Sequence, residues 1–509
     1  MVKRAGGALL LGIAIEHGAA RPVSAQLYAS LRDLMLSGSL AAGERLPATR
    51  TLARDLGVSR TTVIDAFERL TAEGLIDSRV GSGTFVSVAL AADRPGRAPE
   101  RSGPDVPHAP VLSRTMASAV ERFGTRQRLP HTPGAFVTAL PALDEFPMGQ
   151  WARIAAKHWR RARREVMGYG EPSGHPALRQ TIAGHLRANR GISCDAEQIF
   201  IVAGAQQAFS LIGTLLLNPG DAVWFENPGA IGARNSLIAS GAELIPVPVD
   251  QEGIRVEEGL RLCPQFRSAF VTPSHQQPLG YVMSLQRRLA LLAAAERAGA
   301  WVIEDDYDSE FFYGRRPLPT LKSVDRTGRV IYVGTFSKSL FPALRLGFIL
   351  APEALVETFA RASVSFVQGV ATSLQGIVAE FIEEGYFATH IRRMRRIYAE
   401  RHAALYEAAQ RSLVGLLEIV PAESGLHTIG NLPSTISEVA AARAAAVRDI
   451  VVSPIARFSL ETTALNGLVL GFGGIKPAEI RSGVERLGQA LAGLQTTRRA
   501  AGGRRQSPT

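Results

Sequence analysis

The beginning of the chain contains short segments whose apolar residues recur at helical spacing. Between residues 26 and 37 they recur at i, i+4, i+7 and i+8, which predicts one buried helical face. Gly38 closes this segment, and a second short helix is expected after Pro47. A third follows Ser59, a suitable N-cap, and ends at Gly74. Helix, tight turn and capped helix in this order are typical of a helix-turn-helix motif.

Two strand-like stretches follow, Leu75–Arg79 and Thr84–Val88, around the glycine-rich turn Gly81-Ser82-Gly83. Glycines at such a turn supply positive φ, so the pattern predicts a β-hairpin that serves as a wing.

The start of the third predicted helix is polar, with Ser59, Arg60, Thr61 and Thr62 in succession. The first residues of the second helix of a helix-turn-helix reach base edges, and an arginine there can bind guanine through two acceptors. We therefore expect these residues to contact DNA. The alternative is that they form only a solvated helix face, but the ordered succession of helix, turn, helix and wing favours DNA binding.

The remaining sequence changes character and divides the chain. We expect a winged helix over residues 22–88 and a linker over 89–130, because residues 89–113 contain five prolines and little periodicity. From residue 131 to 495, strand-like runs alternate with amphipathic helices, which predicts an α/β domain with a mostly parallel sheet. Residues 496–509 are basic and small, and we expect a disordered tail.

A lysine within the α/β domain lies between two buried-strand patterns. The segment 330–350 places a polar turn between them, and the turn holds Thr335, Ser337, Lys338 and Arg345. Burying a lysine is costly unless it is neutral, paired or covalently used, so Lys338 is a candidate Schiff-base former. The hydroxyls and the arginine would suit a phosphate group. On this segment alone, a surface lysine on a loop is an equally good interpretation.

A second segment favours the chemical interpretation of Lys338. The apolar run 300–303 ends in the acidic stretch Glu304–Asp308, which begins with three consecutive carboxylates, and carboxylates clustered there need a cationic partner. A pyridinium nitrogen is one such partner. A metal ion is the competing partner, but His175 and His275 show no ligand spacing, so we expect no metal.

A third segment is suited to anion binding. The strand pattern 199–202 leads through Ala203 and Gly204 into an amphipathic helix, whose N-terminal N–H groups and dipole favour a phosphate. Lysine, acid and anion-binding turn together form a much stronger signal than any one of them.

Composition narrows the class of protein. With 509 residues, 46% apolar and 20% charged, the chain is an ordinary globular protein, which excludes disordered and coiled-coil classes. The net charge of +11 is a weak indication of nucleic acid. Two cysteines, Cys194 and Cys263, provide no disulfide framework, and no apolar run is long enough to span a membrane. We expect a cytoplasmic protein without membrane contact.

The charge count is unusual in one respect that bears on chemistry. Lysine occurs at only five positions, Lys3, Lys157, Lys322, Lys338 and Lys476, so few residues could supply a primary amine.

The segment from LYASLRDLML to GSGTFV resembles the GntR family of winged-helix bacterial repressors. The resemblance implies that the operator is contacted by Arg50, Arg60, Thr61 and Thr62, and in the wing by Gly81, Ser82, Gly83 and Thr84. Residues 1–88 hold ten basic and eight acidic side chains. Affinity for double-stranded DNA must therefore depend on the placement of charges and on a dimer rather than on bulk charge.

Residues 131–495 resemble fold-type I aminotransferases, on the motifs YGEPSGHPALR, VAGAQQAF, FENPGAIGAR, VTPSHQQPLG, VIEDDYDSEF and GTFSKSLFPALRLGF. With the winged helix, the whole chain resembles the MocR/GabR-type subfamily of GntR regulators. The resemblance implies an internal aldimine between Lys338 and pyridoxal 5′-phosphate, with Asp305 at the pyridine nitrogen and Tyr307 at the ring hydroxyl. The phosphate would be held by Gly204, Ala205, Gln206, Thr335, Ser337 and Arg345. Tyr169 would reach the phosphate of a partner subunit, which implies a homodimer.

The chain departs from the family pattern at several positions. Ala230 replaces the usual tyrosine of PGY, Leu279 replaces the threonine of PTG, and Ala203 lacks a hydroxyl that many relatives carry. The strand pattern 467–472 lacks the arginine with which aminotransferases hold a substrate carboxylate, and Arg457 is the candidate substitute.

The leading hypothesis is a transcription regulator that senses an amine or amino acid through external aldimine formation at Lys338. One alternative is an active aminotransferase with a fused DNA-binding module. Another is a repressor whose large domain serves only as a dimerisation scaffold.

Overall fold

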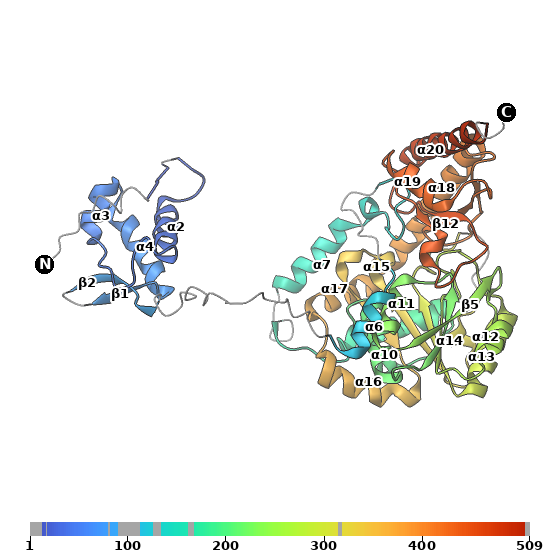
Figure 1. The fold of residues 1–509 in the computed structure, drawn as a ribbon. Coiled ribbons are helices and arrows are strands. Elements are labelled where there is room, and N and C mark those ends of the chain that lie inside the picture. The colour runs from blue at the N-terminus through green and yellow to red at the C-terminus, as the bar shows by residue number, and fades with distance from the viewer. Residues whose placement is uncertain are drawn as a thin grey trace, which may run out of the picture. The chain divides into compact units, whose positions relative to one another are not determined.

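The computed structural model describes residues 13–16, 18–79, 82–89, 112–125, 134–160, 167–313 and 318–503, and their side chains as far as residue 495. The chain divides into two compact units, residues 1–110 and residues 111–509. Figure 1 shows both units, and each is described by itself.

The smaller unit contains three helices and a hairpin: α2 (Val23–Leu36), α3 (Thr49–Leu56), α4 (Arg60–Ala72), β1 (Ile76–Arg79) and β2 (Gly83–Val86). The apolar faces predicted from helical spacing meet in one core that includes Leu27, Leu31, Val63 and Leu70. Strands β1 and β2 pair antiparallel, as the wing requires. The predicted helix-turn-helix with a wing is therefore present.

The larger unit contains an eight-stranded sheet in the order β3-β10-β9-β8-β7-β4-β5-β6. The run from β9 to β5 is parallel, and β10 and β6 pair antiparallel with their neighbours. The predicted mostly parallel sheet is confirmed. Its strands are β3 (Ile199–Val202), β4 (Ala222–Asn227), β5 (Glu243–Asp250), β6 (Gly253–Ile254), β7 (Ser268–Val271), β8 (Trp301–Asp306), β9 (Val330–Thr335) and β10 (Gly347–Leu350).

Helices cover both faces of this sheet (Figure 1). Alternate residues of each strand enter different cores: Ile303 of β8 packs with α10, α11 and α16, whereas Val302 packs with α12, α13 and α14. These helices are α10 (Ala205–Leu216), α11 (Ile231–Ala239), α12 (Val256–Leu262), α13 (Leu285–Ala298), α14 (Leu321–Val324) and α16 (Val356–Ala362).

A third core fills the space between the sheet and the remaining helices. It joins residues of β3 and β10 to α7 (Met148–Arg160), α9 (Pro176–Arg190), α17 (Thr372–Glu383) and α18 (Tyr386–Ser412).

A second, antiparallel sheet forms a smaller lobe of the same unit, in the order β11-β12-β14-β13. Its elements are β11 (Glu418–Ile419), β12 (His427–Asn431), β13 (Ser453–Pro454) and β14 (Gly467–Gly471), with α19 (Glu438–Ala446) and α20 (Pro477–Gly503).

Two boundaries differ from those expected. Helix α6 (Arg114–Arg122) lies within the span assigned to the linker, yet it buries Ala119 in the core beside α11. Helix α20 continues to Gly503, so residues 496–503 of the expected tail are helical. Among the described helices, none combines the length and the apolarity needed to cross a bilayer.

Candidate functional site

A cavity of about 250 Å³ lies between the two lobes of the larger unit. Its walls include residues from the ends of β8 and β9, the start of α10, the start of α11 and the smaller lobe. Ligands of parallel α/β sheets bind beyond the carboxyl ends of the strands, where this cavity lies. The predicted site residues in its wall are Gly204, Ala205, Gln206, Asp305, Tyr307, Thr335, Ser337, Lys338, Arg345 and Arg457.

Lys338 is in α15 (Phe336–Ser339), a single turn that begins directly after β9. The side chain lines the cavity, and its Nζ donates a hydrogen bond of 2.5 Å to the carbonyl of Ala139. Lys338 is therefore a residue of the cavity wall and not a lysine on a surface loop.

One end of the cavity has the chemistry of a phosphate site. Helix α10 begins immediately after Gly204, whose φ of +89° is the left-handed conformation that favours glycine. The first N–H groups of a helix have no partner within it and attract anions. Ser337 donates its backbone N–H to Thr335 Oγ1 at 3.2 Å, and the Arg345 guanidinium lies beside Gly204. Backbone donors, two hydroxyls and a cation thus converge.

Asp305 also lines the cavity and is 6% exposed. Burial raises the pKa of its carboxyl well above the usual value, and the neighbouring Asp306 and Asp308 raise it further. Among the described residues, Oδ1 of Asp305 has no hydrogen-bond partner. A buried carboxylate oxygen without a donor fits a protonated pyridine nitrogen, so the residues present are suited to pyridoxal phosphate.

Two other acids of this stretch, Glu304 and Asp306, are absent from the cavity wall. Glu304 and Asp306 lie on the opposite face of β8 from Asp305, because side chains alternate along a strand. Glu304 accepts the backbone N–H groups of Leu321 and Lys322 at 2.9 and 2.8 Å. The three carboxylates therefore do not converge on one point, although the charge of Asp306 still raises the pKa of both Glu304 and Asp305.

Asp306 has partners of its own on that face. Its Oδ2 accepts a hydrogen bond of 2.5 Å from the Tyr332 hydroxyl and lies 3.6 Å from Nη2 of the buried Arg190.

Tyr307 belongs to a buried network in which one imidazole nitrogen has two partners. Nδ1 of His275 lies 3.0 Å from the Tyr307 hydroxyl and 2.9 Å from Oδ2 of Asp308. Burial raises the pKa of Tyr307 well above its usual value, and the charge of Asp308 adds to this effect. The phenol therefore remains protonated and can act as a hydrogen-bond donor in the cavity.

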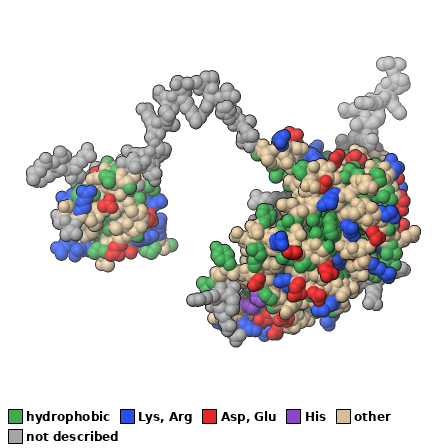
Figure 2. Space-filling model, turned by 90° about the horizontal axis from the view of Figure 1, so that it is seen from below, with side chains coloured by type: hydrophobic (Ala, Val, Ile, Leu, Met, Phe, Trp, Pro, Cys, Tyr) green, Lys and Arg blue, Asp and Glu red, His purple; other side chains and the backbone are tan. Residues whose placement is uncertain are grey.

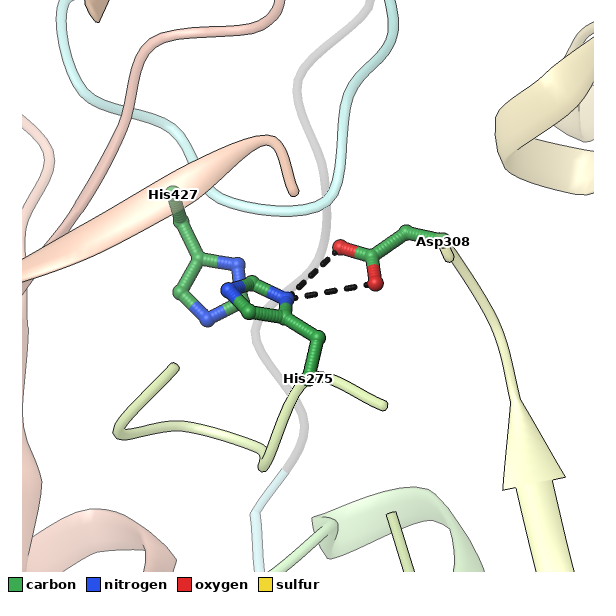
Figure 3. A group of neighbouring side chains, drawn as sticks. All are labelled: His275, Asp308 and His427. Atoms are coloured by element: carbon green, nitrogen blue, oxygen red, sulfur yellow. Dashed lines mark hydrogen bonds and ion pairs between the residues drawn. The ribbon is translucent and has the colours of Figure 1, made fainter. Parts of the chain in front are cut away.

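His275, Asp308 and His427 form a group that the sequence reasoning missed (Figure 3). Their donor atoms lie within 4.8 Å of one another, and two imidazoles with a carboxylate are a donor set that suits zinc. Burial lowers the pKa of His427 to about 3, with a further contribution from His275, so His427 is neutral. The three residues follow β7, follow β8 and begin β12, so local ligand spacing could not reveal the group.

The departures from the family pattern are all within the folded structure. Ala230 lines the cavity, and Leu279 is buried with Ile231 in a small apolar core. Ala203 donates its backbone N–H to Gln207 Oε1 at 2.6 Å.

Arg457 lies in the short helix η6 (Ile455–Phe458) and lines the cavity. Its Nε and Nη2 both donate to the carbonyl of Thr125, at 3.2 and 2.8 Å. Tyr169, in contrast, is fully exposed and is absent from the wall of this cavity.

The predicted DNA-contacting residues lie at the start of α4 and on the wing. Arg50, Arg60 and Thr61 are exposed, whereas Ser59 caps α4 by accepting the N–H of Thr62 at 3.1 Å. Thr84 is on β2, as is Gly83, and Ser82 is exposed in the turn; Gly81 lies outside the described residues.

On the larger unit, surface charge by itself does not outline a binding face. On the face shown in Figure 2, basic and acidic side chains are interspersed over the larger unit.

A winged helix and an aminotransferase-type lobe with a lysine-containing cavity define a DNA-binding regulator with a fused aminotransferase-like domain. Comparison with known families agrees with this class. Residues 23–86 match the model for bacterial regulatory proteins of the gntR family, and residues 142–487 match that for aminotransferases of class I and II.

The chain belongs to the GntR-type regulators of the MocR kind, in which both domains are fused. It is 40% identical to the probable rhizopine catabolism regulatory protein MocR of Rhizobium meliloti, over 95% of this chain and 97% of that protein. It is 30% identical to the pyridoxine biosynthesis transcriptional regulator PdxR of Corynebacterium glutamicum, over 91% and 94%.

Solved aminotransferases share the fold of the larger unit. The α-aminoadipate aminotransferase LysN of Thermus thermophilus, complexed with N-(5′-phosphopyridoxyl)-L-leucine, superposes with a TM-score of 0.69 at 29% identity. This match covers 76% of the present chain and all of LysN. Membership of the class I and II aminotransferase fold implies dependence on pyridoxal phosphate.

Proposed function

We propose that this regulator binds pyridoxal 5′-phosphate in the cavity at Lys338 and senses a primary amine or amino acid there. The observation that carries the proposal is the position of Lys338 in the same cavity as the buried carboxylate of Asp305, whose Oδ1 has no hydrogen-bond partner among the described residues. The LysN structure, which holds a phosphopyridoxyl compound on the same fold, supports it. Ligand binding favours one conformational state, and DNA affinity shifts by the difference in binding free energy.

Different residues of the cavity would hold different parts of the cofactor. When bound, pyridoxal phosphate supplies an aldehyde carbon that combines reversibly with primary amines. Lys338 would provide the resident amine, and Asp305 would hold a proton on the ring nitrogen. Tyr307, oriented by His275, would donate to the ring hydroxyl. The phosphate would be bound by the N–H groups of Gly204, Ala205 and Gln206 and by Thr335, Ser337 and Arg345.

Visible absorbance tests this proposal directly. The purified protein should absorb as a lysine Schiff base does, and Lys338→Ala should abolish the band. Lys476→Ala, which removes an exposed lysine, is the matched control and should retain it. A colourless wild type that takes up no added pyridoxal phosphate would overturn the proposal.

Aminotransferase turnover is a second candidate function, because the identity to LysN extends over the whole of that enzyme. The described β14 carries no arginine that could hold a substrate carboxylate, which favours sensing over turnover. Incubation with amino donors and 2-oxo acids should therefore give negligible product. Rapid multiple turnover would favour the enzyme.

We also propose that the chain acts in the cytoplasm as a homodimer on double-stranded operator DNA. The full exposure of Tyr169 supports a role for this residue toward a partner subunit. The exposure of Arg60 at the start of α4 supports base contact.

Sedimentation and DNA titration test these assignments. The protein should sediment as a dimer, and Arg60→Ala should weaken specific DNA binding by about 1–3 kcal/mol, or roughly five- to 150-fold. Arg32→Ala is a suitable control because its exposed ion pair with Glu73 contributes little to stability. Unchanged affinity of Arg60→Ala for its own promoter region would contradict the recognition-helix assignment.

A further inference from the structure

The segment 112–125 is the first described part of the larger unit, and in the sequence it follows the winged helix and the linker. It contains α6, of which only Ala119 is fully buried, while Met116 of the helix and Phe123, which follows it, are partly packed. A nine-residue helix is marginal on its own in water. The position of the segment therefore depends on a small number of contacts.

Two polar contacts hold the end of this segment. Gly124 exchanges a pair of hydrogen bonds with the side chain of Asn235, N–H to Oδ1 at 2.9 Å and Nδ2 to carbonyl at 2.8 Å. The carbonyl of Thr125 accepts both bonds from Arg457. The chain passes so close to Arg234 that a Cβ on Gly124 would lie 1.5 Å from its guanidinium. We call Gly124, Thr125, Asn235 and Arg457 the clasp.

Both elements that hold the clasp also form the wall of the cavity. Helix α11 contributes Ile231 and Gly232 to the wall and Asn235 to the clasp. The short helix η6 contributes Phe458 to the wall, and Arg457 belongs to both. A ligand in the cavity and the segment 112–125 would therefore both lie against Arg457.

The edge of Arg457 that faces Thr125 matches a carboxylate better than it matches a single carbonyl oxygen. Nε and Nη2 form the edge of the guanidinium that matches the two oxygens of a carboxylate. In the structure both N–H groups of this edge converge on one neutral carbonyl oxygen. A carboxylate offers this edge two oxygens and a full negative charge, both of which the single carbonyl of Thr125 lacks, so a carboxylate is the better-matched partner.

We propose that Arg457 is an exchange point, at which the carboxylate of an amino-acid effector replaces the carbonyl of Thr125 and releases the segment 112–125. The inference rests on the proposed function, because it requires an effector amine at the cofactor. It adds that the effector is an amino acid rather than a plain amine. It also adds that the signal leaves the cavity through the clasp toward the linker.

Amide hydrogen exchange of Arg457 variants, measured without an effector, tests the clasp first. In full-length protein with cofactor, Arg457→Ala should speed amide hydrogen exchange of residues 112–125 by about tenfold or more. Arg457→Lys keeps the charge but loses the planar edge, and should give an intermediate increase. Asn235→Ala should also speed exchange, whereas Arg297→Ala on the exposed face of α13 should not. Unchanged exchange in Arg457→Ala would overturn the inference.

Matched pairs of ligands test the exchange itself. The probes are L-alanine with ethylamine, L-phenylalanine with 2-phenylethylamine, and L-lysine with cadaverine, each pair differing by one carboxylate. Among the ligands that change the cofactor spectrum, only those with a carboxylate should speed amide hydrogen exchange in residues 112–125. In Arg457→Ala, the two ligands of a pair should give the same exchange rate.

The outcomes separate this inference from the proposed function. An amino acid that changes the spectrum without faster exchange, or an amine that speeds exchange equally, would overturn the inference alone. If no probe changes the spectrum, these pairs contradict sensing at Lys338, and the ligand-free variants still decide whether the clasp exists.

Discussion

Strand β8 ends with carboxylates on both of its faces, and the two faces pair them differently. On one face Glu304 accepts two backbone N–H groups, and Asp306 is bound by Tyr332 with Arg190 nearby. On the other face Asp305 points into the cavity, and its Oδ1 has no partner among the described residues. Residues of the same chemical type thus serve folding on one face and remain available to a ligand on the other.

The difference shows how a fold can tolerate a costly residue. A buried charge without a partner is destabilising, so an unpartnered carboxylate persists only where function requires it. Glu304 and Asp306 each have partners within the unit, although Oδ1 of Asp306 has none, whereas Asp305 accepts no hydrogen bond from the described residues. Substitutions on the two faces should therefore have separable effects.

The largest effect is expected from Asp305→Asn. Loss of the negative charge opposite the ring nitrogen should weaken cofactor binding by about a hundredfold or more, since breaking a buried charge pair costs roughly 3–5 kcal/mol. Titration of the apoprotein with pyridoxal phosphate, followed by absorbance, measures this change. The unfolding free energy should change little or rise, because an uncompensated buried charge has been removed.

The next effect is a change in the pH dependence of stability in Glu304→Gln. Burial raises the pKa of Glu304 to about 7, and the charge of Asp306 adds to this. Between the ordinary glutamate pKa and that value, the unfolded chain loses the proton first. The contribution of Glu304 to the free energy of unfolding therefore falls as the pH rises through this range, and the total loss is on the order of 3 kcal/mol.

Urea unfolding at several values from about pH 5 to about pH 8 measures this dependence. The slope should be shallower in Glu304→Gln than in the wild type, while Glu296→Gln, at an exposed position of α13, should keep the wild-type slope. Identical slopes in all three proteins would contradict the assignment.

A smaller effect is expected from Asp306→Asn, which keeps the shape of the side chain. The charged partner of Arg190 is lost, although Glu310 still lies 3.4 Å from that guanidinium, so the unfolding free energy should fall by about 2 kcal/mol. Cofactor affinity should stay within a few fold of the wild type. If Asp305→Asn and Asp306→Asn lowered stability and cofactor affinity alike, the two faces would not differ in the way described.

The smallest effect extends the comparison to the winged helix. Ser59 caps α4, whereas the neighbouring Thr61 is exposed. Ser59→Ala should lower the local stability of α4 by about 1 kcal/mol, measured by hydrogen exchange without DNA, and Thr61→Ala should change it much less. Equal effects would show that the cap is not specific to Ser59.

The elements of both units follow from local sequence patterns, which explains what could be predicted. Helical spacing and the cap at Ser59 predicted α2, α3 and α4, and apolar runs predicted β3, β8, β9 and β10. The setting of Lys338 was predictable because strand, polar turn and strand are contiguous in the sequence.

The unpredicted features depend on contacts between distant segments. The acidic run in β8 does not show which carboxylates find partners, because Arg190 and Tyr332 are remote in the sequence. His275 and His427 meet only when the two lobes pack together. Helix α6 lies in a region of linker-like composition, and its burial depends on α11.

The wall of the cavity includes Thr138, which comes early in the sequence of the larger unit, and Val469, which comes late in it. During synthesis the winged helix can fold on the emerging chain from its own local contacts, long before that wall is complete. A chain that stops short of β14 would therefore keep its DNA-binding module and lack the complete pocket. Premature termination would therefore not yield an inert product, because the fragment would retain a folded DNA-binding module that has no means of responding to the effector.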